Sequence, residues 1–114
     1  MTSTRNRDVH QTAALAALGV PGVSALQPGL ADRLAAVASR AQAASLPGEA
    51  GIRAEHTPEG DWHVEVRCVV HEDHRVLHVA QQVREHVRTA VTALLAQHGT
   101  TAPVTVLVTV TRTV

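Results

Sequence analysis

The amino-acid sequence predicts an α+β fold: a small two-layer domain whose three-stranded sheet is covered on one face by an N-terminal helical segment and one long amphipathic helix. Three consecutive stretches support this prediction. Apolar and polar residues alternate over 61–70, repeat with a period near 3.6 over 76–94, and alternate again over 104–113. A change of period from two to 3.6 and back is typical of a strand, a helix and a second strand.

The stretch 61–70 is predicted to be a strand with one buried face. A shorter alternating run over 51–56 precedes it, and residues 57–61 between them contain the turn-forming pair of Pro58 and Gly60. We therefore predict that the two strands form an antiparallel β-hairpin. The side of the longer strand that is expected to be buried carries Trp62, Val64, Val66, Cys68 and Val70, opposite His63, Glu65 and Arg67.

An amphipathic helix is predicted to begin after Asp73 and to end at Gly99. Asp73 is a suitable N-cap, and glycine commonly follows the last turn of a helix. The regular apolar stripe predicts that this helix packs along the sheet. The stripe consists of Val76, Val79, Ala80, Val83, Val87, Ala90, Val91 and Leu94.

The last predicted strand opens at Pro103 and consists mainly of valine and threonine. Residues 104–110 contain no charge and no proline, and a free edge of this kind invites pairing with another chain. The strand is therefore either internal, with a solvated threonine face, or an edge that is used for self-association, and we favour the internal position. Val104, Val106, Val108 and Val110 are expected on the buried side, opposite Thr105, Thr109, Thr111 and Thr113.

The N-terminal part is predicted to contain a disordered leader, residues 1–7, and then a helix. The single domain is expected to cover 8–114, with Asp8 as the N-cap of a first helix that ends at Leu18. A turn follows at Gly19. A second helix is predicted from about residue 30 to 45, between two Pro-Gly breaks, with a weak alanine-rich apolar stripe.

The composition limits the possible functions. The chain has 114 residues, which is enough for one modest core, and its ten basic residues balance ten acidic ones. This balance argues against a nucleic-acid or anionic-membrane footprint, and a net charge near zero favours association. The core must be built from valine, leucine and alanine, because the chain has one tryptophan and neither phenylalanine nor tyrosine.

The single cysteine permits a reducing compartment, which is the default expectation, and the hydropathy predicts no membrane span. Cys68 lies on the predicted buried side of its strand, where we interpret it as a small apolar core residue, and one cysteine excludes an internal disulfide. No apolar run approaches the roughly 18 residues of a membrane span, and the N-terminus has no apolar signal region. We predict a cytoplasmic protein without direct membrane insertion, which reaches the cell membrane only peripherally through a partner.

Three histidines beside two acidic residues form a candidate metal site. His74 and His78 are four residues apart, so on a helix both could reach one ion, and His71 lies just before them. The predicted face is exposed and does not carry a His-Glu-x-x-His motif. We therefore favour a solvated polar surface with neither metal nor cofactor, and metal binding or pH sensing by these histidines stays an open alternative.

The other candidate motif is the Gly-x-x-Gly turn from Gly19 to Gly22. It formally matches the backbone clamp of KH-type RNA-binding modules, but its central residues are apolar and no basic residue adjoins it. We favour a helix-ending turn, with a small nucleic-acid-binding module as the alternative. The sequence contains no nucleophile elbow, phosphate loop or paired carboxylates in an apolar setting, so we do not expect an enzyme or catalytic residues.

Taken together, four segments resemble the alkaline shock protein family of bacterial envelope stress response proteins. They are the helix and Val-Pro-Gly-Val turn over 13–23, the dense strand over 62–70, the valine-striped helix over 76–87 and the valine strand over 104–110. The chain departs from the family in two places. Many relatives carry a Tyr-Gly pair where 71–74 reads His-Glu-Asp-His, and the segment 30–45 resembles an addition.

This resemblance implies a non-enzymatic, cytoplasmic protein of the envelope stress response. Such a protein self-associates as a homo-oligomer and is held near the membrane by a separate anchor protein. The features of the chain agree with these expectations, because its charge is balanced and one of its strands could join another chain. The expected function is that of a scaffold whose helix faces and sheet edge contact other copies and the anchor.

Overall fold

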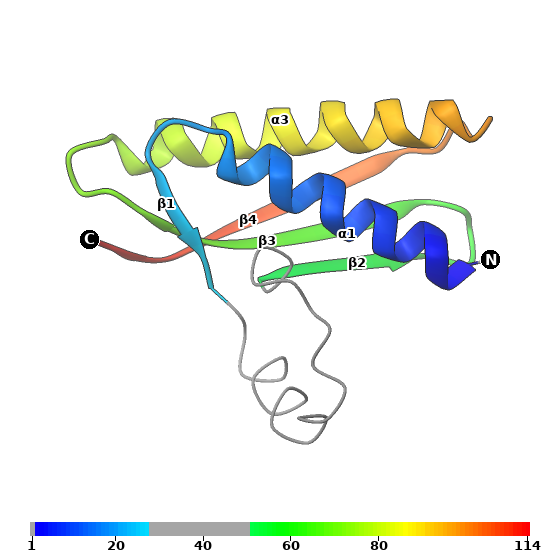
Figure 1. Cartoon of the computed structure of the whole chain (residues 1–114), viewed down its shortest axis with the longest axis horizontal. Helices are drawn as coiled ribbons and strands as arrows, with labels where there is room; N and C mark the ends of the chain where they lie inside the picture. Colours follow the sequence, from blue (N-terminus) through cyan, green and yellow to red (C-terminus); the bar gives the residue numbers. More distant parts are fainter. Residues whose placement is uncertain (1, 28–50) are drawn as a thin grey trace, which may run out of the picture.

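A computed structural model describes residues 2–27 and 51–114 of the protein (Figure 1). The predicted α+β class is confirmed. Two helices run along one sheet, and the two ends of the chain lie at opposite ends of the molecule in this view. The elements are α1 (Thr2–Leu18), β1 (Val23–Leu26), β2 (Ile52–His56), β3 (Trp62–Val70), α3 (Val76–Gln97) and β4 (Val104–Thr113).

The sheet has four strands, one more than the sequence predicted, and β3 lies at its centre. On one side β3 pairs antiparallel with β2, which confirms the predicted hairpin, and with the additional strand β1. On its other side β3 pairs parallel with β4 along almost its whole length. A parallel neighbour requires a crossover connection, and α3 supplies it, so β3, α3 and β4 form a β-α-β unit.

Strands β1 and β2 occupy one continuous line along β3. Leu26 is the partner of Cys68 and Ile52 is the partner of Val66, which leaves Arg67 between them. The Arg67 carbonyl accepts a hydrogen bond from the Gln27 N–H, while the Arg67 N–H donates to the Gly51 carbonyl, each at 2.9 Å. In an antiparallel ladder a single residue makes both of these bonds. Two residues that are 24 positions apart in sequence therefore replace one residue of a single interrupted strand.

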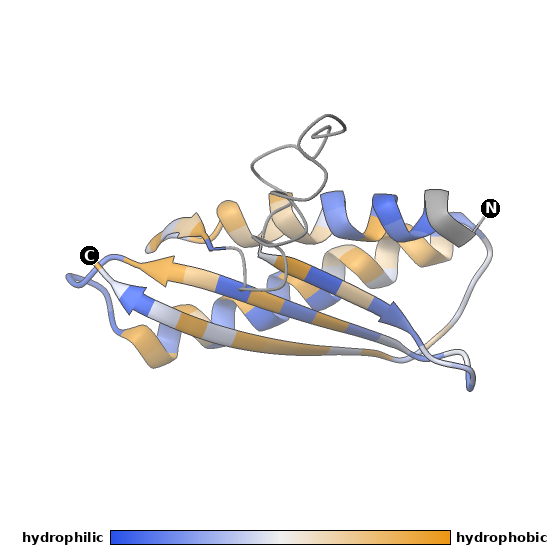
Figure 2. Cartoon of the chain, turned by 90° about the horizontal axis from the view of Figure 1, so that it is seen from below, coloured by the Kyte–Doolittle hydropathy of each residue, from blue (hydrophilic) through white to orange (hydrophobic). Residues whose placement is uncertain are grey.

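The core lies between the sheet and the two helices, which cover the same side of the strands (Figure 2). Trp62 is the largest fully buried side chain, and it packs among valines, as expected for a chain so poor in aromatic residues. The alternation predicted for β3 is confirmed. The core includes Val9, Ala13 and Ala17 of α1, Trp62, Val64, Val66, Cys68 and Val70 of β3, Val79, Val83, Val87, Val91 and Leu95 of α3, and Val106 of β4.

Several helix boundaries differ from the prediction. Helix α1 begins at Thr2 and not after Asp8, so residues 2–7 of the expected leader are helical. Helix α3 begins at Val76 with Arg75 as its N-cap, and no side chain caps it, so the role predicted for Asp73 is wrong. The predicted helix end is confirmed, because Gly99 adopts a φ of +74° just after His98. The second helix predicted over 30–45 lies outside the described residues.

The position of β4 corrects the preference for an internal strand. Among residues 2–27 and 51–114, β3 is the only strand that pairs with β4, so β4 forms an edge of the sheet. Its valines face the helices as predicted: Val106 is 7% exposed, and Val104, Val108 and Val110 pack partly against the core. Strand order is set by the packing of the whole unit, and the pattern within one strand does not contain it.

Candidate interaction surface

The free edge of β4 presents a regular row of backbone hydrogen-bonding groups. The Pro103 carbonyl accepts a hydrogen bond from the Trp62 N–H at 2.9 Å, so the backbone of Pro103 faces β3. Successive residues of a strand turn their backbone groups to opposite sides, and the register continues without a shift from Val104 to Val110. The N–H and C=O groups that point away from β3 are therefore those of Val104, Val106, Val108 and Val110.

The uninterrupted part of this edge ends at a bulge. The register of β4 against β3 shifts between Cys68 and Val69, after which the Val114 N–H donates to the Val70 carbonyl at 2.9 Å. The hydroxyl of Thr111, at the bulge, donates to the Gln27 side chain at 2.8 Å and fixes the far end of the sheet. A bulge disrupts the regular ladder, so the usable edge covers residues 104–110.

An exposed apolar side chain lies in the middle of this edge. On the sheet face that is turned away from the helices, β4 carries Thr105, Leu107 and Thr109, and Leu107 is 59% exposed. Its partner on β3 is Glu65, whose carboxylate lies 3.9 Å from the Arg67 guanidinium. Along β4, its neighbours on the same face of the sheet are Thr105 and Thr109.

The opposite edge of the sheet is protected by helix α1. The Ala54 residue of β2 alternates with Arg53 and Glu55, whose backbones face β3, so the Ala54 N–H points outward. The His10 side chain of α1 accepts a hydrogen bond from this N–H through Nε2 at 3.1 Å. A nitrogen that accepts must be unprotonated, so His10 carries its proton on Nδ1 in this arrangement.

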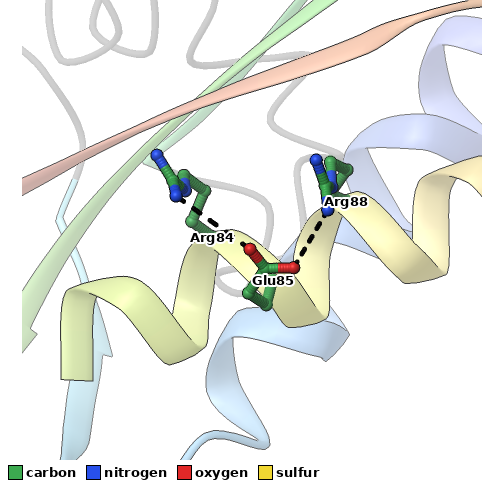
Figure 3. A network of polar contacts seen from close by, with 3 residues as sticks. All are labelled: Arg84, Glu85 and Arg88. Carbon is green, nitrogen blue, oxygen red and sulfur yellow. Dashed lines mark hydrogen bonds and ion pairs between the residues drawn. The ribbon is translucent and has the colours of Figure 1, made fainter. Parts of the chain in front are cut away.

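The outer surface of α3 is charged and well solvated. Glu85 lies 3.1 Å from the Arg88 guanidinium and 4.0 Å from that of Arg84, and all three side chains are more than half exposed (Figure 3). Ion pairs as exposed as these contribute little to stability. A hollow of about 510 Å³ beside them is lined by Ala16, Glu85, His86, Thr89 and Ala90. This surface therefore differs from the β4 edge, which carries no charge from 104 to 110.

His74 and His78 of the candidate metal site do not form a pair on one face of a helix. His74 precedes the first residue of α3, so it does not share a helix face with His78. Its Nδ1 lies 3.0 Å from Asp73 Oδ1, and this hydrogen bond is the main reason why the pKa of the Asp73 carboxyl lies below its ordinary value. Within residues 2–27 and 51–114, no group of three or more His, Cys, Asp and Glu side chains could hold a metal ion.

The backbone of the segment that follows β3 connects the two edges. The His71 N–H donates to the Gly22 carbonyl at 2.8 Å, and the Glu72 N–H donates to the Val114 carbonyl at 2.7 Å. Gly22 lies just before β1, and Val114 lies just after β4. The histidine-rich segment therefore has a structural role that its sequence did not suggest.

The Gly19 to Gly22 turn packs closely against the start of α3. Gly22 has a φ of +98°, and a Cβ atom there would lie 2.7 Å from Cγ2 of Val79. The Val23 N–H donates to the Val20 carbonyl at 3.2 Å, which closes the turn and leads the chain into β1. The glycine is thus needed for close packing and for its backbone conformation.

Cys68 and Trp62 are core residues of β3. Cys68 is fully buried, and this burial raises the pKa of its thiol, which opposes formation of the reactive thiolate. The His56 ring stacks on the Trp62 ring, with centroids 4.6 Å apart and planes 5° from parallel. His56 is the last residue of β2, so this contact closes the hairpin over the core.

Sequence reasoning missed the residues that distinguish the two edges. His10 and Ala54 are 44 positions apart, and Gln27 and Thr111 are 84 positions apart. Residues so far apart in sequence form no local pattern from which their contact could be predicted. Only the unbroken alternation of β4, which predicts a strand that is prone to pairing, could have pointed to the open edge.

Comparisons with protein-family models, with curated proteins and with solved structures give no match to this chain. The helices in the part of the chain that the structure describes are too short or too polar to cross a membrane. The geometry of the chain itself is therefore the basis for assigning a function.

Proposed function

We propose that this chain is a non-enzymatic scaffold of the bacterial envelope stress response, which self-associates and is held near the cytoplasmic membrane by a separate anchor protein. The observation that carries the self-association is the open edge of β4, with its row of outward backbone groups over 104–110. Native sheets usually cover, shorten or charge such an edge. Within residues 2–27 and 51–114, none of these protections is found over 104–110, and such an edge favours pairing with a further strand.

The electrostatics of the chain support association between copies. Formal charges cancel at neutral pH when histidine is neutral, so copies do not repel one another through net charge. The same balance offers no electrostatic attraction to an anionic lipid surface. Placement near the membrane is then a matter of protein contacts, and the resemblance to the alkaline shock protein family supplies the anchor protein in this proposal.

Self-association is tested by the mass of the protein in solution. Sedimentation velocity and light scattering after gel filtration, from micromolar to millimolar concentration at near-neutral pH, are expected to give a mass above that of the 12.0 kDa chain. The mass should change little with salt, because backbone pairing and apolar contact are not screened by ions. A monomer at every concentration would reject the self-association.

The anchor is tested with two membrane preparations of the same lipid composition. The purified protein is expected to sediment with native cytoplasmic-membrane vesicles and not with protein-free vesicles made from their extracted lipids. Protease treatment of the native vesicles before mixing should abolish the binding. Equal binding to both preparations would show direct lipid contact and contradict an anchor protein.

A further inference from the structure

We propose that two copies of this chain join through their β4 strands in one antiparallel, two-fold symmetric register that places Leu107 opposite Leu107 of the second copy. This inference rests on the proposed self-association and specifies its surface and its geometry. The occupant of the edge is then a second copy of the same chain.

The sequence of the edge is a palindrome. From residue 104 to residue 110 it reads Val-Thr-Val-Leu-Val-Thr-Val, which is identical in both directions around Leu107. A two-fold axis reverses the direction of a strand. A palindrome therefore places identical residue types opposite each other when two copies pair around its centre. An isologous interface of this kind is self-complementary by construction.

The backbone geometry selects the same centre. The outward groups belong to residues 104, 106, 108 and 110, and their midpoint is residue 107. Pairing around it brings Val104 opposite Val110 and Val106 opposite Val108 of the second copy, in each direction. These pairs are hydrogen-bonded pairs, in which two residues exchange both N–H···O bonds. All outward groups between Pro103 and the bulge then have partners.

The side chains fit this register on both faces of the sheet. Residue 107 becomes a non-hydrogen-bonded pair, the arrangement with the closest side chains, so each exposed Leu107 covers the other. Thr105 of one copy then lies opposite Thr109 of the other, a favourable cross-strand pair. The partly exposed valines of β4 meet on the face that carries the helices.

Charged residues of the two β4 strands do not oppose one another in this register. Pairs in this register have residue numbers that sum to 214, so Arg112 of one copy lies opposite Ala102 of the other. An axis perpendicular to the sheet is the one that makes neighbouring strands antiparallel and keeps each face on its own side. Both helical layers therefore lie on the same side of one continuous sheet.

The register is tested in the full-length protein by introducing a charge of either sign at residue 107, its centre. Leu107→Lys and Leu107→Glu are each expected to weaken the dimer roughly tenfold or more, because each variant places like charges directly opposite each other. An equimolar mixture of the two variants is expected to recover the dimer, because lysine then faces glutamate. Sedimentation velocity measures the dissociation constants. Leu107 is 59% exposed, so both variants should fold and keep the wild-type circular dichroism spectrum.

Thr105→Glu is the matched control for the mixture. In the proposed register residue 105 faces residue 109, so mixing Leu107→Lys with Thr105→Glu should recover the dimer less well than mixing it with Leu107→Glu. Equal recovery would overturn the register. If both Leu107 variants assemble as the wild type does, self-association stands and this surface is wrong, which would turn attention to the exposed Leu15 and Leu77 of the helical layer. A monomeric wild type would overturn both proposals.

Hydrogen exchange provides a second readout that does not need a substitution. Amides of Val106 and Val108 point outward from β4, whereas the amides of Thr105, Leu107 and Thr109 face β3. In dilute monomer the two valine amides should exchange much faster than their neighbours, and in the dimer they should become protected. Fast exchange of both valine amides in the assembled protein would contradict the pairing.

Discussion

The two edges of the sheet have opposite designs. The edge formed by β1 and β2 is interrupted where residues 27 and 51 meet, and a histidine of α1 covers one of its outward N–H groups. The β4 edge continues without interruption from 104 to 110 and meets no other described strand. Interruption and coverage are common ways to prevent unwanted strand pairing. The difference indicates that the fold closes one edge and leaves the other available.

The largest expected effect comes from breaking the interrupted edge at Gly51. Its φ is +94°, and a Cβ there would lie 2.9 Å from the Gln27 nitrogen and 3.0 Å from the Arg67 carbonyl oxygen. Backbone atoms cannot move aside as a flexible side chain can. We expect Gly51→Ala to lower the free energy of unfolding by about 2–5 kcal/mol, from backbone strain and from overpacking together. Urea denaturation followed by circular dichroism measures this loss.

Gly60→Ala is the matched control for this prediction. Gly60 has nearly the same φ, +95°, but no atom lies within 4 Å of the position of its Cβ. This variant should lose only the cost of the left-handed conformation, about 1–2 kcal/mol. Equal losses for the two variants would mean that the close approach of Gln27 and Arg67 to Gly51 does not contribute, and would contradict the junction.

The second prediction concerns a deletion that joins β1 and β2 into one continuous strand. Deletion of residues 28–51 joins Gln27 directly to Ile52, so that one residue opposite Arg67 connects β1 and β2 in register. We expect the shortened chain to fold, with a free energy of unfolding that is higher by about 1–3 kcal/mol, because the entropy cost of bringing residues 27 and 52 together across the intervening chain is removed. Thermal and urea unfolding measure the change.

The control for this deletion retains one additional residue. Deletion of 28–50 leaves both Gln27 and Gly51 in a gap that fits a single residue. A shift of one residue turns every following side chain to the other face, so this variant must form a bulge or lose the β2 pairing. It should be less stable than the 28–51 deletion. The opposite order of stability would show that β1 and β2 are not one interrupted strand.

Local periodicity explains which parts of the fold could be predicted. The core face of β3 and most of the α3 stripe follow directly from spacings of two and 3.6. The predicted stripe is wrong at its ends, because Val76 is 38% exposed and Leu95, which was not included, is buried. Strand β1 was missed because it has only four residues, directly after the glycine of a turn, and half of them are exposed. So short a strand gains its stability from pairing with Val70, Val69 and Cys68, a contact that the local sequence does not contain.

The candidate surface could be predicted only in part, for the same reason. The composition of 104–110 identified a strand that is prone to pairing, but its place at the edge depends on where the crossover through α3 sets it beside β3. The pairing of His74 with His78 on one helix face, on which the metal alternative depended, does not occur because α3 starts at Val76, after His74. A helix boundary that moves by two residues changes which side chains share a face.

The third and smallest effect concerns the coverage of the protected edge. Replacement of His10 by phenylalanine keeps a ring of similar size but removes the nitrogen that accepts from the Ala54 N–H. We expect His10→Phe to lower the free energy of unfolding by about 1 kcal/mol, the typical contribution of a hydrogen bond between partly buried groups. Exchange of the Ala54 amide should also become faster, because this amide points away from β3 and has lost its acceptor.

His63→Phe provides the control, because it makes the same replacement at an exposed histidine of β3. It should leave the exchange rate of the Ala54 amide unchanged. The free energy of unfolding should change by no more than about 0.5 kcal/mol. If His10→Phe leaves Ala54 exchange unchanged, the β2 edge does not depend on this side chain. The contrast between a covered and an open edge would then have to rest on the interruption at Arg67 alone, which the deletion of 28–51 removes without touching His10.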